Sequence, residues 1–198
     1  HTMELLADDL KSLIDALSIQ QVVLGGFSMG GYAALAFYRK YRERVHSLLL
    51  LDTRPEADSE QGKTGREEMA QLAEREGAAP IADRLIPRLL TENTVANRPE
   101  TVGFVREMIL ACSVKGIAGD LRGMALRADS TGLLPSISSP TLVVVGDKDL
   151  ITPPDAAESM ANLIPNAKLQ IVPGAGHISN LENSEAFTSA IHDFLHAH

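Results

Sequence analysis

The sequence predicts an α/β fold in which a parallel sheet is covered by helices. Two observations lead to this prediction. The short apolar segments at residues 45–51 and 141–145 lack alternation, which is typical of strands that are buried on both faces. Between such segments, apolar residues recur every three or four positions, as they do in amphipathic helices. Repeated alternation of strand and helix favours parallel strands joined by right-handed crossovers.

Length, composition and charge indicate a single folded domain and argue against nucleic-acid binding. The chain has 198 residues, enough for one domain with a substantial core, and its 44% hydrophobic and 22% charged residues predict a folded protein. The formal net charge is −8, and no segment concentrates the lysine and arginine that a phosphate backbone requires. Nucleic acid is therefore not expected as a partner.

The first quarter of the chain alternates helix and strand. We expect a helix over residues 3–17, a strand over 22–24, a helix over 29–41 and a strand over 45–51. The apolar stripe of the first helix is interrupted by Asp8, Asp9, Lys11 and Asp15, so it is amphipathic and predicts neither a signal peptide nor a membrane span.

The middle of the chain differs from both ends. Residues 54–134 contain no plausible strand, and we interpret them as a helical lid inserted into a core formed by residues 1–53 and 135–198. Helical periodicity is found in this insertion at residues 63–76, 81–90, 99–113 and 116–127.

The strand pattern returns after the insertion. A strand over residues 141–145 precedes a helix for which Thr152 is the expected cap and Pro153 the first-turn residue. Pro165 is expected to stop that helix. A fourth strand over residues 168–172 and a terminal helix over 184–195 complete the predicted core.

A glycine-rich turn follows the first predicted strand and opens a helix. Its sequence, GGFSMGG at residues 25–31, fails the dinucleotide pattern because Phe27 occupies the position of the middle glycine. It fails the phosphate-loop pattern because Gly31 stands where lysine is required. It matches Gly-x-Ser-x-Gly, the strained turn that presents a serine hydroxyl, here that of Ser28, at the carboxyl end of a strand.

A serine nucleophile needs a base and an acid that orients the base. Asp149 follows the strand at residues 141–145, and His177 follows the last predicted strand, so both fall at the carboxyl edge of the sheet, in the order Ser, Asp, His. Asp52 and Asp147 also follow strands and are alternative acids.

Together these motifs resemble the α/β-hydrolase family, and the resemblance extends over the whole chain. It is carried by residues 26–31, 140–149 and 174–177. The resemblance implies Ser28 as nucleophile, Asp149 as acid and His177 as base, with the amide of Met29 as one oxyanion donor. It is strongest toward carboxylesterases and enol-lactonases, and it implies no metal or organic cofactor.

The sequence lacks the strands that precede the serine turn in family members, and this difference predicts a binding partner. Family members begin with several strands before the serine turn, and the loop after the third strand supplies a second oxyanion amide. This sequence starts about one helix before the turn. We therefore expect an N-terminally truncated fold in which the strand at residues 22–24 has an unpaired edge. Such an edge predicts a homo-oligomer or a complementing N-terminal piece.

Several residues of the insertion are candidates for the substrate pocket. We expect Met108, Ile109 and Met124, together with Phe27 of the serine turn, to contact substrate, although the insertion residues could equally pack the lid. Cys112 is expected to be a small buried residue of the insertion. As the single cysteine it cannot form an internal disulfide, which favours a reducing, cytoplasmic location.

The sequence leaves two functional hypotheses. The first is a serine hydrolase that acts on small carboxylic esters, as an esterase or lactonase, through an acyl-enzyme. The alternative is a truncated, catalytically impaired hydrolase module that serves as an interaction or assembly unit. His192 and His196 lie four residues apart on the terminal helix, but a solvated helical face explains them better than a metal site.

Overall fold

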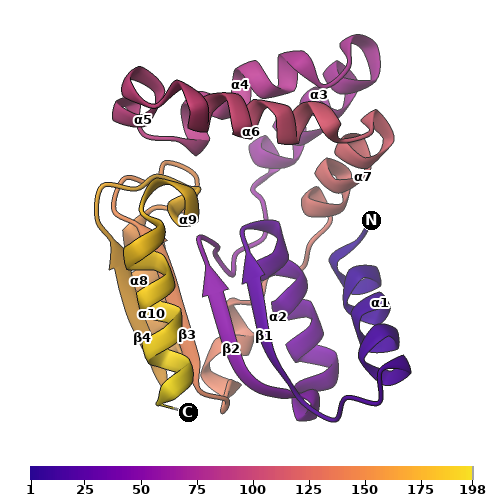
Figure 1. The fold of residues 1–198 in the computed structure, drawn as a ribbon. Helices are drawn as coiled ribbons and strands as arrows, with labels where there is room; N and C mark the ends of the chain where they lie inside the picture. Colours follow the sequence, from indigo (N-terminus) through magenta and orange to yellow (C-terminus); the bar gives the residue numbers. More distant parts are fainter. Residues whose placement is uncertain (198) are drawn as a thin grey trace.

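The computed structural model describes residues 1–197 and contains a four-stranded parallel sheet. The strands are β1 (Val22–Phe27), β2 (Val45–Leu51), β3 (Thr141–Gly146) and β4 (Ala167–Val172), and they lie side by side in chain order (Figure 1). Because every pairing is parallel, all four carboxyl ends meet at one edge of the sheet. The predicted fold class is confirmed.

Helices cover the two faces of the sheet. On one face, α1 (Met3–Ala16), α2 (Met29–Tyr41) and α8 (Pro154–Leu163) contribute to a core with Leu48 and Leu50 of β2. On the other face, α10 (Ser184–His196) places Phe194 in a cluster with Leu49 and Leu51. Side chains of a strand alternate between faces, so the four consecutive leucines serve two separate cores.

The insertion forms a helical layer across the carboxyl edge of the sheet (Figure 1). It contains α3 (Glu60–Glu76), α4 (Ala79–Leu89), α5 (Glu92–Asn97), α6 (Pro99–Ala111) and α7 (Val114–Ala125). The short helix α5 had no counterpart in the sequence prediction. A 3-10 helix, η2 (Thr131–Ser136), follows and buries Leu134 in the sheet core, so the expected boundary at residue 134 falls inside this helix.

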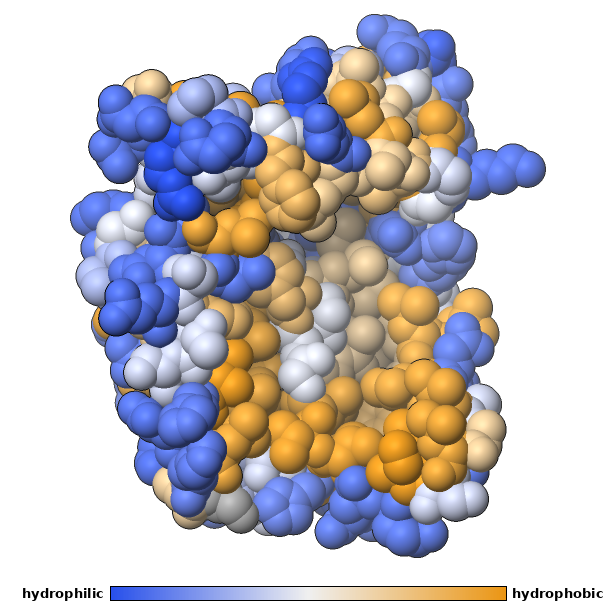
Figure 2. All heavy atoms as spheres, in the orientation of Figure 1, coloured by the Kyte–Doolittle hydropathy of each residue, from blue (hydrophilic) through white to orange (hydrophobic). Residues whose placement is uncertain are grey.

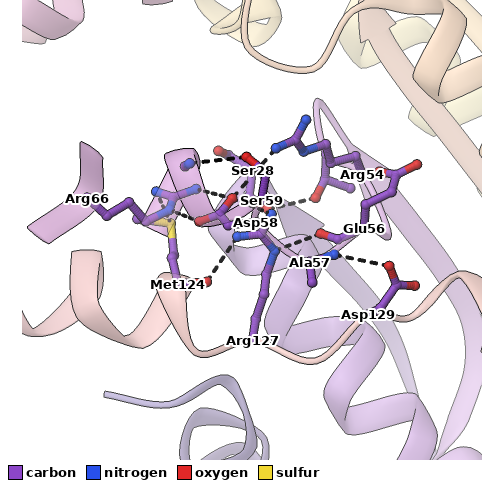
Figure 3. Close-up of polar contacts among 12 residues, drawn as sticks. Ser28, Arg54, Glu56, Ala57, Asp58, Ser59, Arg66, Met124, Arg127 and Asp129 are labelled. Atoms are coloured by element: carbon purple, nitrogen blue, oxygen red, sulfur yellow. Dashed lines mark hydrogen bonds and ion pairs between the residues drawn. The ribbon is translucent and has the colours of Figure 1, made fainter. Parts of the chain in front are cut away.

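A buried ionic cluster holds the two ends of the insertion together (Figure 3). Asp58, which follows β2, pairs with Arg66 of α3 and with Arg127 after α7, the latter at 2.8 Å. Burial alone would raise the pKa of Asp58, but hydrogen bonds from Arg66 and Arg127 outweigh it and lower the pKa. Arg127 also lies over the ring of Tyr32 in α2, 4.2 Å from its centroid. The insertion is thus fastened at its base to the core.

Most predicted element boundaries are displaced by one to three residues, and two of the differences bear on the site. β1 continues through the glycines to Phe27, because Gly25, Gly26 and Phe27 pair in register with β2. The helix predicted to be capped by Thr152 begins at Pro154, with Pro153 in the cap position. Thr152 binds an aspartate side chain instead of capping the helix. A short helix, α9 (Ser179–Glu182), was also not predicted.

Within residues 1–197, no helix combines the length and the apolar character needed to cross a lipid bilayer.

One edge of the sheet is free in the described part of the chain. Within residues 1–197, β1 pairs with β2 alone. Val23 on this strand is 46% exposed, and Leu13 and Leu17 near the end of α1 are 55% and 59% exposed. Figure 2 shows hydrophobic residues gathered on the lower half of the face that carries β1 and α1. A free strand with apolar neighbours is a template for pairing with another chain.

We predict that the isolated chain pairs this edge of β1 with a second copy, unless a segment that adds strands to the edge is present. Light scattering coupled to size-exclusion chromatography of the chain should therefore report a mass above that of one copy, and Val23→Lys should lower the apparent mass because it places a charge on the edge. A dilute monomer with an intact fold would contradict the prediction.

Candidate active site

Ser28 occupies a strained turn between β1 and α2. Its backbone has φ 50° and ψ −114°, a conformation that costs about 1–3 kcal/mol for a residue other than glycine. Three hydrogen bonds hold the turn in place. The Ser28 amide donates to the carbonyl of Leu51 at 2.8 Å, and its carbonyl accepts from the Gly31 amide at 2.9 Å and from the Thr53 hydroxyl at 2.8 Å.

Two glycines allow the chain to approach itself around this turn. A Cβ on Gly26 would lie 2.3 Å from the carbonyl oxygen of Gly30, and a Cβ on Gly31 would lie 2.4 Å from the hydroxyl oxygen of Thr53. Both distances are far below van der Waals contact, so neither position accepts a larger residue without a backbone shift. Close packing of β1 against α2 explains the glycine at the first position of the motif, Gly26. The second motif glycine, Gly30, has nothing within 4 Å of its Cβ position.

The structure brings Ser28, His177 and Asp149 together at the carboxyl edge of the sheet. The Nε2 atom of His177 lies 2.8 Å from the Ser28 hydroxyl oxygen, and Nδ1 lies 2.8 Å from Oδ2 of Asp149. An ionised carboxylate only accepts hydrogen bonds, so Nδ1 carries the proton and Nε2 is free to accept from Ser28. His177 and Asp149 are both buried, at 2% exposure.

The carboxylate of Asp149 is held by several donors. Oδ1 accepts from the amides of Ile151 and Thr152 at 2.7 and 3.0 Å, and Oδ2 accepts from the Thr152 hydroxyl at 2.6 Å. Burial acts to raise the pKa of Asp149, but the hydrogen bonds from His177 and Thr152 outweigh it, and the pKa is lowered. Asp149 is therefore ionised at neutral pH and fixed in orientation.

The two alternative acids have other partners. Asp147 accepts from the amide of Ala175 at 3.2 Å and pairs with its neighbour Lys148 at 3.6 Å. Asp52 is fully buried and accepts from the Gly146 amide and the Ser179 hydroxyl. In this geometry Asp149 is the aspartate that contacts the histidine ring.

Met29 is the first residue of α2, so its amide belongs to the opening turn of the helix. Amides in that turn lack an intrahelical acceptor, and the positive end of the helix dipole lies beside them. The position next to the Ser28 hydroxyl is thus suited to a developing negative charge.

A cavity of about 530 Å³ opens in front of Ser28 and His177, between the sheet edge and the insertion. Figure 2 shows this face hollowed below the insertion. Three residues expected to contact substrate, Phe27, Met108 and Ile109, line the cavity. Its other lining residues are Leu89, Phe104, Val105, Ile178, Asn180 and Leu181. The lining is therefore mostly apolar.

Two expectations for the insertion were wrong. Met124 is not among the residues that line this cavity, because α7 packs against α3 and turns the Met124 sulfur toward the guanidinium of Arg66, at 3.3 Å. Cys112 is exposed rather than buried, because α6 ends at Ala111 and leaves the thiol at the helix terminus, 3.4 Å from the carbonyl of Met108.

The described residues contain no group of three or more histidine, cysteine or acidic side chains placed to hold a metal ion. His192 and His196 stack on the exposed surface of α10, with ring centroids 3.9 Å apart.

Sequence reasoning missed several residues around the site. Thr152 was expected to cap a helix, but its hydroxyl and its amide both donate to the Asp149 carboxylate. An aspartate that accepts from backbone amides two and three residues later is a common local pattern. The cavity residues on α4 and α9 gave no local signal, since only the folded chain brings Leu89 and Leu181 beside Ser28.

Comparison with known proteins identifies the family of this fold. The family model described as alpha/beta hydrolase fold matches residues 1–184. The chain belongs to this family.

Individual relatives are named for cleavage of esters and lactones. A thermophilic esterase from Thermogutta terrifontis, solved with malate bound, is 46% identical with a TM-score of 0.96, over 100% of this chain and 73% of that one. The enol-lactonase from Burkholderia xenovorans LB400 is 29% identical with a TM-score of 0.90, over 98% and 73% of the two chains. 3-Oxoadipate enol-lactonase 2 of Acinetobacter baylyi is 29% identical over 96% of this chain and 70% of its own length.

We predict that Gly26→Ala lowers the free energy of unfolding by about 1–3 kcal/mol, the usual cost of an overpacked contact. Gly30→Ala is the matched control, because nothing lies within 4 Å of a Cβ at that position. Urea denaturation of both variants checks the prediction. Equal stability of the two would show that the turn tolerates a Cβ at residue 26.

Proposed function

We propose that the protein hydrolyses small carboxylic esters through Ser28 as nucleophile, His177 as general base and Asp149 as the acid that orients the base. The observation that carries the proposal is the continuous hydrogen-bonded line from the Ser28 hydroxyl through both ring nitrogens of His177 to the Asp149 carboxylate. The broader class, a carboxylic ester hydrolase, follows from the family and from relatives that are esterases and enol-lactonases.

In the first half-reaction, the Ser28 oxygen attacks the ester carbonyl while Nε2 of His177 takes the hydroxyl proton. The carbonyl π electrons move onto the oxygen, and the Met29 amide donates to that oxyanion. Asp149 stabilises the imidazolium that forms, because its carboxylate faces Nδ1 at 2.8 Å. When the intermediate collapses, His177 returns the proton to the departing alcohol oxygen, leaving an acyl-enzyme.

The second half-reaction repeats the sequence with water. His177 removes a proton from water as the oxygen attacks the acyl carbon, and the proton then passes to the Ser28 oxygen as the acid is released. A lactone follows the same steps, except that its alcohol remains attached to the acyl group.

The cavity favours substrates with small apolar groups. Its volume of about 530 Å³ and its lining of aliphatic, methionine and phenylalanine side chains suit short acyl or alcohol moieties. Phe27 lies beside the histidine, with ring centroids 5.7 Å apart, so it borders the reacting carbonyl. The single thiol, Cys112, is consistent with a reducing compartment, and we assign the protein to the cytoplasm.

A second candidate function is an impaired hydrolase module that acts as an interaction unit. The free edge of β1 favours it, because that edge can accept a further strand. The two functions differ in one respect that can be measured, which is whether Ser28 is activated.

We expect Ser28→Ala to lower kcat for p-nitrophenyl acetate and butyrate by about 10⁴-fold or more, because no other group in the line can form the acyl-enzyme. Ser159→Ala is the control, since that exposed hydroxyl only contacts a helix carbonyl in α8. Release of p-nitrophenol measures turnover, and a fluorophosphonate probe measures activation of the serine.

Equal hydrolysis by the wild type and Ser28→Ala, with no labelling of Ser28, would reject the esterase and favour the interaction unit. Labelling of Ser28 with poor turnover would show that the serine is activated and that these two esters are not its preferred substrates.

The apolar lining generates a separate prediction about acyl-chain preference. Met108→Ala should lower kcat/KM for the butyrate ester relative to the acetate ester by about 3- to 10-fold, because it removes apolar contacts worth about 1 kcal/mol. Met124→Ala should leave that ratio unchanged, as Met124 faces Arg66 rather than the cavity. A similar ratio in both variants and the wild type would show that Met108 does not contact the acyl chain.

A further inference from the structure

Asp52 is a buried acidic residue that the proposed reaction does not use. It directly follows β2, is 0% exposed, and has a positive φ of 44°. An aspartate tolerates this backbone region better than most residues, but the conformation is uncommon. Burying a carboxyl group lowers stability unless its oxygens accept hydrogen bonds. The hydrogen-bond partners of Asp52 therefore indicate its role.

Each oxygen of Asp52 binds a different part of the site. Oδ1 accepts from the Gly146 amide at 2.9 Å, at the end of β3. Oδ2 accepts from the hydroxyl of Ser179, the first residue of α9. Neither Gly146 nor Ser179 contacts the reacting atoms. One side chain therefore joins two segments that are far apart in the sequence.

These two segments carry the acid and the base. Gly146 precedes Asp149 by three residues, and the Asp149 amide donates to its carbonyl at 3.2 Å. Ser179 follows His177 by two residues. The segments also pack directly against each other, since a Cβ on Gly146 would lie 2.2 Å from the carbonyl oxygen of Gly176. Asp52 thus connects the end of β2 to the loop that carries Asp149 and to the loop that carries His177.

The electrostatics of Asp52 distinguish it from Asp149. Burial raises the pKa of Asp52 to about 7, although the hydrogen bonds from Ser179 and Gly146 oppose the shift. The charged groups that act on it are His177, which lowers the pKa, and Asp149, which raises it. Asp52 can accept from the Gly146 amide in either protonation state, so the link between the segments does not require a full charge.

We infer that Asp52 is a positioning residue that holds the loop of Asp149 and the loop of His177 in register, and thereby sets the contact between His177 Nδ1 and Asp149 Oδ2. This inference rests on the proposed function of the three catalytic residues. Through the histidine, the same link sets the approach of Nε2 to the Ser28 hydroxyl. A misplacement of about 1 Å at such a contact is enough to cost on the order of 10²-fold in rate.

The experiment compares three variants with p-nitrophenyl butyrate as substrate. Asp52→Ala removes both links and should lower kcat by about 10- to 100-fold with KM within about 2-fold of the wild type, because substrate contacts are left in place. Ser179→Ala removes one link and should lower kcat by about 3- to 10-fold. Asp52→Asn keeps a carbonyl oxygen for Gly146 and an amide for Ser179, so it should retain most of kcat.

Rates are expressed per active site, with folded sites counted by complete fluorophosphonate labelling of Ser28. Asp129→Ala is the control for a merely structural effect. Asp129 accepts from the amides of Ala57 and Thr131 at the base of the insertion, so its loss should lower the melting temperature without changing kcat.

The inference is overturned if folded Asp52→Ala and Ser179→Ala both keep kcat within about 2-fold of the wild type, or if Asp52→Asn loses as much as Asp52→Ala. If Asp52→Ala does not fold, the test is the comparison of kcat between Ser179→Ala and Asp52→Asn. The inference then requires a lower kcat in Ser179→Ala than in Asp52→Asn. A wild type that neither turns over the ester nor labels at Ser28 rejects the proposed function, and the inference with it. An active, labelled wild type with unaffected variants rejects the inference alone.

Discussion

The strained turn at Ser28 is the constraint on which the rest of the site depends. A positive φ at a serine persists because its amide and carbonyl are bound on both sides, by Leu51 of the neighbouring strand and by the Thr53 hydroxyl. The cost of the conformation is met by the packing of β1, β2 and α2. As a result, the Ser28 hydroxyl lies 2.8 Å from Nε2 of His177, directly before the opening turn of α2.

Two buried aspartates at the same sheet edge have opposite pKa shifts because their hydrogen-bond partners differ. Asp149 is surrounded by donors, including His177 and the amides of the following turn, and its pKa is lowered. Asp52 has fewer donors for the same degree of burial, and its pKa is raised to about 7. Asp149 is thus ionised at neutral pH and faces the ring of His177, whereas Asp52 connects the segments that carry Asp149 and His177.

The insertion determines what can reach the serine. Its base is fixed to the core by the Asp58 cluster, while α4 and α6 turn apolar residues toward the cavity. On the side of the histidine, Glu182 accepts from the amides of Gly176 and Thr91 at 2.6 and 2.9 Å, so the loop of His177 and the insertion are joined. The contacts of Glu182 therefore connect the segment that carries His177 to the helices that line the cavity.

The sequence by itself determined the order of the four strands and of the main helices, and it placed the serine, the histidine and the candidate aspartates at one edge of the sheet. Unalternating apolar segments specify buried parallel strands, and parallel strands place their following residues at one edge, so Ser28 and His177 were expected to meet there with one of three aspartates. Resemblance to the α/β-hydrolase family selected Asp149 among the three. Tertiary structure alone decided the direction of Met124, the exposure of Cys112, the cavity residues of α4 and α9, and the partners of Asp52. These depend on packing between helices distant in sequence, which no local periodicity encodes.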